Sequence, residues 1–139
     1  MLLTPDTVFV GLSERTSAAA VEALAALSPR PVVGVPVHRG LHLKTSVTFL
    51  GNHLLLIDPE SVETSRLREF EWIVTGADER YAANALALGK KVILPAGFSR
   101  VAGEIQNRGF EVLEVPLSEF EKADGGVTCL SLIIPEVPV

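Results

Sequence analysis

The sequence predicts an α/β fold in which three similar units form a partial α/β propeller. A pattern of strand, turn, strand, helix and strand occurs three times along the 139 residues. The second and third helices would begin at Ser61 and Ser99, and this spacing of about 38 residues is typical of a repeated supersecondary unit. The strands are nearly continuous apolar runs, which predicts strands buried on both faces and helices as an outer layer. An ordinary three-layer α/β sandwich is the alternative, but it would not place a hairpin before each helix.

The first unit begins with two short apolar runs, which predict strands over residues 1–3 and 7–11. An alanine- and leucine-rich helix is expected over residues 18–27, because residues 13–17 offer serine and threonine side chains that cap helices. An apolar strand over residues 31–37 completes the unit.

In the second unit, strands are predicted over residues 45–50 and 54–57, and Gly51–Asn52 forms the turn between them. A helix is expected over residues 61–70, and a strand over residues 72–75 returns.

The third unit repeats this order, with strands over residues 84–88 and 91–94. The predicted helix covers residues 99–108 and ends at Gly109, a residue type typical of helix C-termini. The strand over residues 111–115 returns.

The composition is that of one globular domain covering residues 1–139. Hydrophobic residues make up 47% and charged residues 21%, which excludes a disordered chain. The net charge of −5 argues against a nucleic-acid partner. No apolar run approaches the roughly 18 residues that span a membrane, and residues 1–6 do not have the features of a signal peptide. The single cysteine cannot form an internal disulfide, which predicts a reducing cytoplasm.

Cys129 is the only cysteine and the first candidate functional residue. It follows the pair Gly125–Gly126 and precedes an apolar run, residues 130–134, that is expected to be a buried strand. A thiol at the mouth of a strand can be aimed into a cleft, where its thiolate acts as a nucleophile beside a base. His42 is the obvious partner, because both residues lie on links between units and such links gather near the axis of a radial arrangement. The alternative is that Cys129 is a small buried hydrophobic residue.

Three motifs stand out along the chain. They are Phe-Val-Gly-Leu-Ser-Glu-Arg-Thr at residues 9–16, Gly-Leu-His-Leu-Lys-Thr at 40–45 and Asp-Gly-Gly-Val-Thr-Cys at 124–129. They resemble dimethylarginine dimethylaminohydrolase, and they occur in the order of that family and at about its spacing. The family belongs to the guanidino-group-modifying, or pentein, superfamily, whose fold is a propeller of five strand-strand-helix-strand modules. The resemblance covers essentially the whole chain and implies about three of the family's five modules.

The resemblance implies a covalent mechanism without a cofactor or a metal. Cys129 would attack the guanidinium carbon of a methylated arginine, and His42 would protonate the leaving amine and then activate water to release citrulline. Arg15 would hold the substrate α-carboxylate, and the backbone of Ala123 would face the substrate. A zinc site formed by His38, His42 and Cys129 is a weaker alternative, because no fourth ligand is evident.

The chain departs from the family pattern at its first residues. A Glu-Gly-Gly-Asp segment precedes the first hairpin in the family, and Met1 falls just after its place. The sequence therefore has no counterpart of the glutamate that would orient the histidine, or of the acidic residues that would grip the guanidinium. Three explanations stay open: a misassigned start, a truncated inactive product with a structural or interaction role, or blades supplied by another chain. Open sheet faces and edges in a partial propeller predict a homo-oligomer, specifically a dimer.

Overall fold

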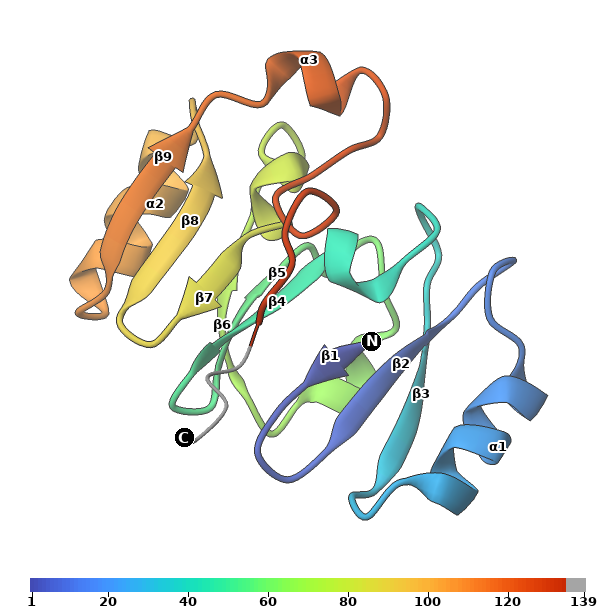
Figure 1. The fold of residues 1–139 in the computed structure, drawn as a ribbon. Coiled ribbons are helices and arrows are strands. Elements are labelled where there is room, and N and C mark those ends of the chain that lie inside the picture. Colours follow the sequence, from blue (N-terminus) through green and yellow to red (C-terminus); the bar gives the residue numbers. More distant parts are fainter. Residues whose placement is uncertain (135–139) are drawn as a thin grey trace.

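The computed structural model of the chain describes residues 1–134 and contains three sheets, each of three strands. In every sheet the first two strands form an antiparallel hairpin, and the third strand runs parallel to the second. Figure 1 shows the three units side by side, with the second unit between the other two. The predicted α/β class is therefore confirmed, together with the order of strands and helical segments in each unit.

The bounds of the elements follow the predicted ones closely. The first unit consists of β1 (Leu2–Leu3), β2 (Val8–Leu12), α1 (Ala18–Leu27) and β3 (Val32–Pro36). The second consists of β4 (Val47–Gly51), β5 (Leu54–Ile57), the 3-10 helix η2 (Thr64–Leu67) and β6 (Glu71–Val74). The third consists of β7 (Leu86–Leu88), β8 (Lys91–Pro95), α2 (Ser99–Asn107) and β9 (Glu111–Val115). The links hold η1 (Leu43–Thr45), η3 (Arg80–Ala83) and α3 (Ser118–Glu121).

The core is built around β5, the central strand of the second unit. Its four residues are apolar and all are buried, as expected for a strand covered on both faces. Because successive side chains point to opposite faces, Leu55 and Ile57 pack toward the first unit, against Phe9 and Val35. Leu54 and Leu56 pack toward the third unit, in a cluster with Val92, Leu94, Val101 and Ile105.

Local signals explain the helices of the first and third units. The Ser17 hydroxyl accepts a hydrogen bond from the Ala20 N–H at 3.3 Å and so caps α1. After α2, Gly109 takes φ of 85°, the left-handed conformation that favours glycine at a helix end. Figure 1 places α1 and α2 at opposite outer sides of the molecule, as the predicted outer layer requires. The helices formed by residues 1–134 are all too short or too polar to cross a lipid bilayer.

The helix predicted over residues 61–70 is wrong. The chain forms only η2 there, because the residues before it are held extended against the end of β3. Val62 forms an isolated bridge with Val37, and the Glu63 N–H donates to the Pro36 carbonyl at 2.9 Å. This pairing between units keeps residues 62 and 63 out of the predicted helix.

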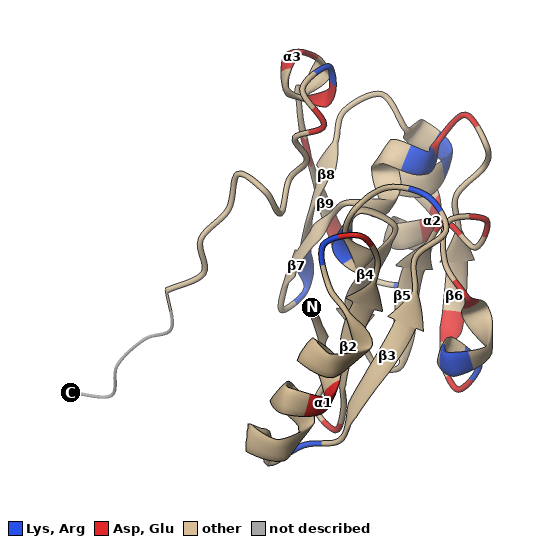
Figure 2. Cartoon of the chain, turned by 90° about the vertical axis from the view of Figure 1, so that its right-hand side faces the viewer, with Lys and Arg blue, Asp and Glu red and all other residues tan. Residues whose placement is uncertain are grey.

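The strand predicted over residues 130–134 is also wrong. Leu130 belongs to a turn, and the following residues lie beside no other strand of the described chain. Leu132 is 85% exposed and Ile134 is 79% exposed, so the segment is not buried. Figure 2 shows it running away from the sheets. An apolar sequence favours a strand only where a neighbouring strand takes up its backbone hydrogen bonds.

Candidate active site

His42 and Cys129 line the same cavity, which has a volume of about 580 Å³. They reach it from different parts of the fold: His42 directly precedes η1, and Cys129 lies in the turn after α3. The rest of the cavity wall carries charges of both signs. The basic side chains are Arg39 and Arg80, and the acidic ones are Asp58, Glu121 and Asp124. A thiol and an imidazole in a cavity with charges of both signs are suited to nucleophilic and acid–base chemistry on a polar substrate.

The position of His42 is fixed by the 3-10 turn that it begins. Its carbonyl accepts hydrogen bonds from the N–H of Thr45 at 3.1 Å and from the Thr45 hydroxyl at 2.6 Å. The next residue, Leu43, is 1% exposed and anchors the turn in the core. Gly11 lies directly against it: a Cβ at Gly11 would be 2.9 Å from both the Cβ and the backbone nitrogen of Leu43. His42 itself is exposed. Its backbone is therefore fixed by the turn, while its imidazole remains exposed.

Asp58, at the carboxyl end of β5, ties two walls of the cavity together. Its side chain is almost fully buried and accepts a hydrogen bond from the Ser61 hydroxyl at 2.5 Å. The Arg80 Nε lies 3.4 Å from Asp58 Oδ2, an ion pair between β5 and η3. The Asp58 N–H donates to the carbonyl of Ser46, just after η1. Asp58 therefore links the segment that carries His42 with η3.

The backbone before Cys129 is held by side chains of the η3 segment. Asn84, which is 2% exposed, accepts two hydrogen bonds at Oδ1 from Thr128, one from its N–H at 3.1 Å and one from its hydroxyl at 2.8 Å. The Tyr81 hydroxyl donates to the Gly125 carbonyl at 2.5 Å. The Cys129 N–H donates to the Gly126 carbonyl at 3.0 Å, which closes the turn. The thiol of Cys129 is exposed, so the interpretation of this residue as a buried hydrophobic residue is wrong.

Arg15 and Ala123 are not among the residues that line the cavity. Both are exposed. The turn that carries Arg15 is nevertheless connected to the His42 loop, because the Ser13 hydroxyl donates to the Leu41 carbonyl at 2.8 Å. Ala123 directly precedes Asp124, which does line the cavity. Their roles toward substrate stay predictions.

Two ionisable groups near the cavity have displaced pKa values. Burial raises the pKa of the Tyr81 hydroxyl, and the negative charges of Glu121 and Cys129 raise it further. Tyr81 therefore stays protonated and keeps its hydrogen bond to Gly125 at neutral pH. Burial lowers the pKa of the Lys44 ammonium, which follows Leu43 in η1.

Sequence reasoning gave no role to Asp58, Tyr81 or Arg80. One signal could have found Asp58: it directly follows an apolar strand, and open α/β sheets bind ligands at the carboxyl ends of their strands. Nothing in the sequence indicates that the η3 segment contacts residues 125–128, because the contact joins segments more than 40 residues apart in the chain.

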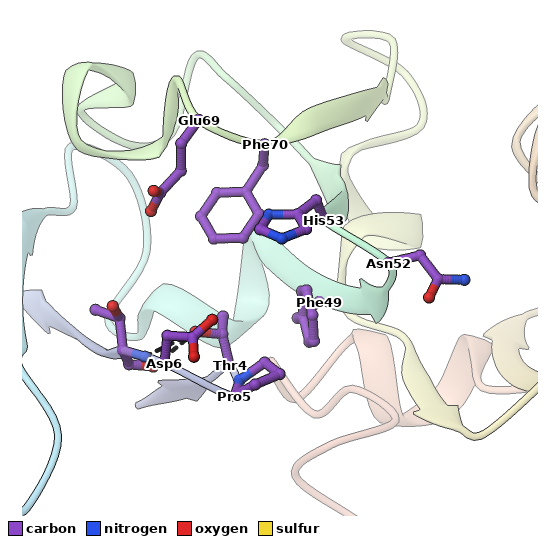
Figure 3. Close-up of a pocket in the computed structure, with 9 residues that line it drawn as sticks. Thr4, Pro5, Asp6, Phe49, Asn52, His53, Glu69 and Phe70 are labelled. Carbon is purple, nitrogen blue, oxygen red and sulfur yellow. Dashed lines mark hydrogen bonds between the residues drawn. The ribbon is translucent and has the colours of Figure 1, made fainter.

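A second cavity of about 270 Å³ lies between the hairpin turns of the first two units (Figure 3). Its wall includes Asp6, Phe49, His53 and Phe70, and the rings of His53 and Phe70 are 5.9 Å apart. This wall includes no cysteine, so the cavity has no thiol nucleophile. Among residues 1–134, no three histidine, cysteine or acidic side chains are arranged to hold a metal ion. The cavity with Cys129 is therefore the candidate active site.

Comparison with known proteins adds independent evidence. No protein-family model matches the sequence. The chain is 36% identical over 135 residues to the N(G),N(G)-dimethylarginine dimethylaminohydrolase of Pseudomonas aeruginosa, a match that covers 95% of this chain and 53% of that protein. It is also 36% identical to the protein of that name from Streptomyces coelicolor, over 95% of this chain and 52% of that protein.

A solved structure of the Pseudomonas aeruginosa enzyme, a cysteine-to-serine mutant complexed with citrulline, superimposes with a TM-score of 0.86 at 33% sequence identity. The match covers 92% of this chain and 51% of that chain. The chain thus spans about half the length of the curated relatives that it matches. By sequence and by fold, it is a homologue of the dimethylarginine dimethylaminohydrolases over nearly its whole length.

Proposed function

We propose that this chain carries the cysteine–histidine part of an amidinohydrolase active site, which hydrolyses a methylated arginine to citrulline and an amine. The observation that supports this most is that His42 and Cys129, distant in sequence, line one cavity in a homologue of dimethylarginine dimethylaminohydrolases. The citrulline complex of the Pseudomonas relative supports the same product. The proposed nucleophile must stay a free thiol, which supports a reducing compartment such as the cytoplasm.

In the proposed reaction, the Cys129 thiolate adds to the guanidinium carbon of dimethylarginine. The bond from that carbon to the dimethylamino nitrogen breaks, and the His42 imidazolium gives its proton to the departing dimethylamine. The product of this half is a thiouronium linked to Cys129. Neutral His42 then takes a proton from water, the oxygen adds to the same carbon, and the carbon–sulfur bond breaks. Citrulline leaves, and the thiolate and the imidazolium are restored.

Other residues are assigned to substrate binding. Arg15 would pair with the substrate α-carboxylate, and the backbone at Ala123 would contact the substrate, as the resemblance to the family implies. The carboxylates of Glu121 and Asp124 in the cavity wall are of the right charge to face the guanidinium. The Asp58 carboxylate forms an ion pair with Arg80 and accepts a hydrogen bond from Ser61, so we assign it a structural role.

The test is citrulline release from dimethylarginine and from arginine by the purified chain. We expect release that disappears in Cys129→Ser and in His42→Ala. His53→Ala is the matched control, because this histidine lines the other cavity, and it should keep wild-type activity. A folded wild-type chain that releases no citrulline would contradict hydrolysis by this chain alone, and would favour either an active site that needs further residues or an inactive protein with a structural or interaction role.

We propose further that the chain forms a homodimer. Large apolar side chains stand exposed on the surface, including Leu27 at 84% and Leu132 at 85%, and such surfaces favour association. Light scattering at micromolar concentration should give twice the monomer mass. A monodisperse monomer would contradict this.

A further inference from the structure

The segment before Cys129 lies against a buried amide. We define the cysteine loop as residues 125–129. Gly126 of this loop is so close to Asn84 that a Cβ at position 126 would lie 2.0 Å from the Asn84 Nδ2. Asn84 is buried, and its Oδ1 accepts both hydrogen bonds from Thr128, so its amide cannot swing away without losing them. Only glycine at position 126 allows the loop to lie this close to the amide.

The loop is held at a second point on the other side of Gly126. The Tyr81 hydroxyl donates to the carbonyl of Gly125, and the Tyr81 ring lies 6.3 Å from the ring of Phe98 in the third unit. Tyr81 and Asn84 are three residues apart on η3 and its end. Together they hold the backbone on both sides of Gly126, directly before the cysteine.

The segment that carries Asn84 is itself fixed to β4. Thr48 of that strand is 1% exposed, and its hydroxyl lies within hydrogen-bond distance of the carbonyls of Ala83 at 2.8 Å and Ala85 at 3.0 Å. The same hydroxyl accepts from the Ala85 N–H at 3.2 Å. The bonds flank Asn84 on both sides. Because η1 leads directly into β4, the strand that fixes Asn84 also fixes the turn that follows His42.

We propose that Asn84 and Tyr81 are positioning residues, which fix the cysteine loop so that Cys129 faces His42 across the cavity. This rests on the proposed function of Cys129 as the nucleophile. Both side chains line the cavity, and each acts on Cys129 through its hydrogen bonds to the backbone of the loop. A nucleophile displaced by about 1 Å can cost a hundredfold in rate, so loss of this anchoring should lower kcat and leave KM little changed.

The experiment compares Asn84→Ala with Asn84→Asp, which keeps an acceptor oxygen at the same place. Kinetics of citrulline release and hydrogen exchange of the Thr128 amide are measured for both. We expect Asn84→Ala to lower kcat at least about tenfold, to change KM less than about twofold and to speed exchange at Thr128. Asn84→Asp should restore most of kcat. Asn107→Ala, an exposed asparagine at the end of α2, is the control and should match the wild type in both measurements.

Two further variants keep the test valid if Asn84→Ala does not fold. Tyr81→Phe retains the ring and removes only the bond to Gly125, and Gly126→Ala disturbs the same contact from the loop side. Both should reproduce the loss of kcat. Faster exchange at Thr128 with unchanged kcat would overturn the positioning role while the proposed function stands. If the wild type releases no citrulline, the proposed function fails, and exchange at Thr128 alone decides whether Asn84 holds the loop.

Discussion

At the residue scale, one threonine hydroxyl holds a large part of the site. The Thr48 hydroxyl, on β4, lies within hydrogen-bond distance of the backbone on both sides of Asn84. Replacing it with valine keeps the shape but leaves the N–H of Ala85 without a partner in a fully buried position. We predict that Thr48→Val lowers the free energy of unfolding by about 1–3 kcal/mol, the usual cost of an unsatisfied buried group.

Chemical denaturation measures this loss. Thr64→Val, at the start of η2, is the control for the threonine-to-valine change away from the site. If the two variants lose the same stability, the hydroxyl of Thr48 does not hold the Asn84 segment.

Tyr81 gives the site a dependence on alkaline pH. Its pKa is raised in the folded chain, so folding favours the protonated hydroxyl. Its contribution to stability is complete below the unfolded pKa of about 10 and is lost as pH rises through the higher folded value. We predict that the difference in free energy of unfolding between the wild type and Tyr81→Phe shrinks as pH rises above about 10. A difference that stays constant over this range would mean that the Tyr81 hydroxyl is not bound in the folded state. Lys44 does not disturb the comparison, because it is present in both chains.

At the scale of elements, η1 depends on a glycine of β2. A methyl group at Gly11 would meet the backbone nitrogen of Leu43, which cannot move without moving η1 and His42. We predict that Gly11→Ala lowers the free energy of unfolding by about 1–3 kcal/mol, as overpacking does, and lowers citrulline release.

Gly103→Ala in α2 is the matched control for Gly11→Ala. Apart from its chain neighbours and the backbone of its own helix, no atom lies within 4 Å of a Cβ placed at Gly103, and glycine within a helix is less favourable than alanine. This variant should be more stable than the wild type by up to about 1 kcal/mol. Equal effects of the two changes would show that the contact between Gly11 and Leu43 is not tight.

The elements also show what a sequence can and cannot predict. The hairpins, α1, β5 and α2 were predicted because their signals are local: apolar runs, turn glycines and a serine cap. The helix over residues 61–70 and the strand over residues 130–134 were wrong because pairing between distant segments decides both. Val62 pairs with Val37, and residues 130–134 pair with no strand in the described chain. Asn84 was expected either to line the cleft or to cap backbone groups at a strand start, and it does line the cavity. Its contact with the cysteine loop, and that of Tyr81, could not be predicted because both join segments distant in the sequence.

At the scale of the whole molecule, the exposed segment after Cys129 is a candidate contact between copies. Leu132 and Ile134 are both largely exposed, and the segment that carries them runs away from the sheets (Figure 2). We predict that replacing both with serine shifts the dimer toward monomer in light scattering, because the apolar area available for burial falls. Leu113→Ser in β9, also an exposed leucine, is the control. If only Leu113→Ser dissociates the dimer, the interface lies on the third unit and not on the segment after Cys129.

The units of the molecule bring together two residues that the sequence separates by most of its length. If Cys129 is the nucleophile, it forms a covalent intermediate in this cavity, and intact-mass spectrometry detects such an intermediate directly. The wild-type chain and Cys129→Ser are each mixed with dimethylarginine and quenched in acid at a series of times. We predict a mass increase equal to the substrate minus dimethylamine, located on Cys129 of the wild type and absent from Cys129→Ser. Citrulline release by the wild type with no such adduct at any time of quenching, or release that persists in Cys129→Ser, would show that Cys129 is not the nucleophile.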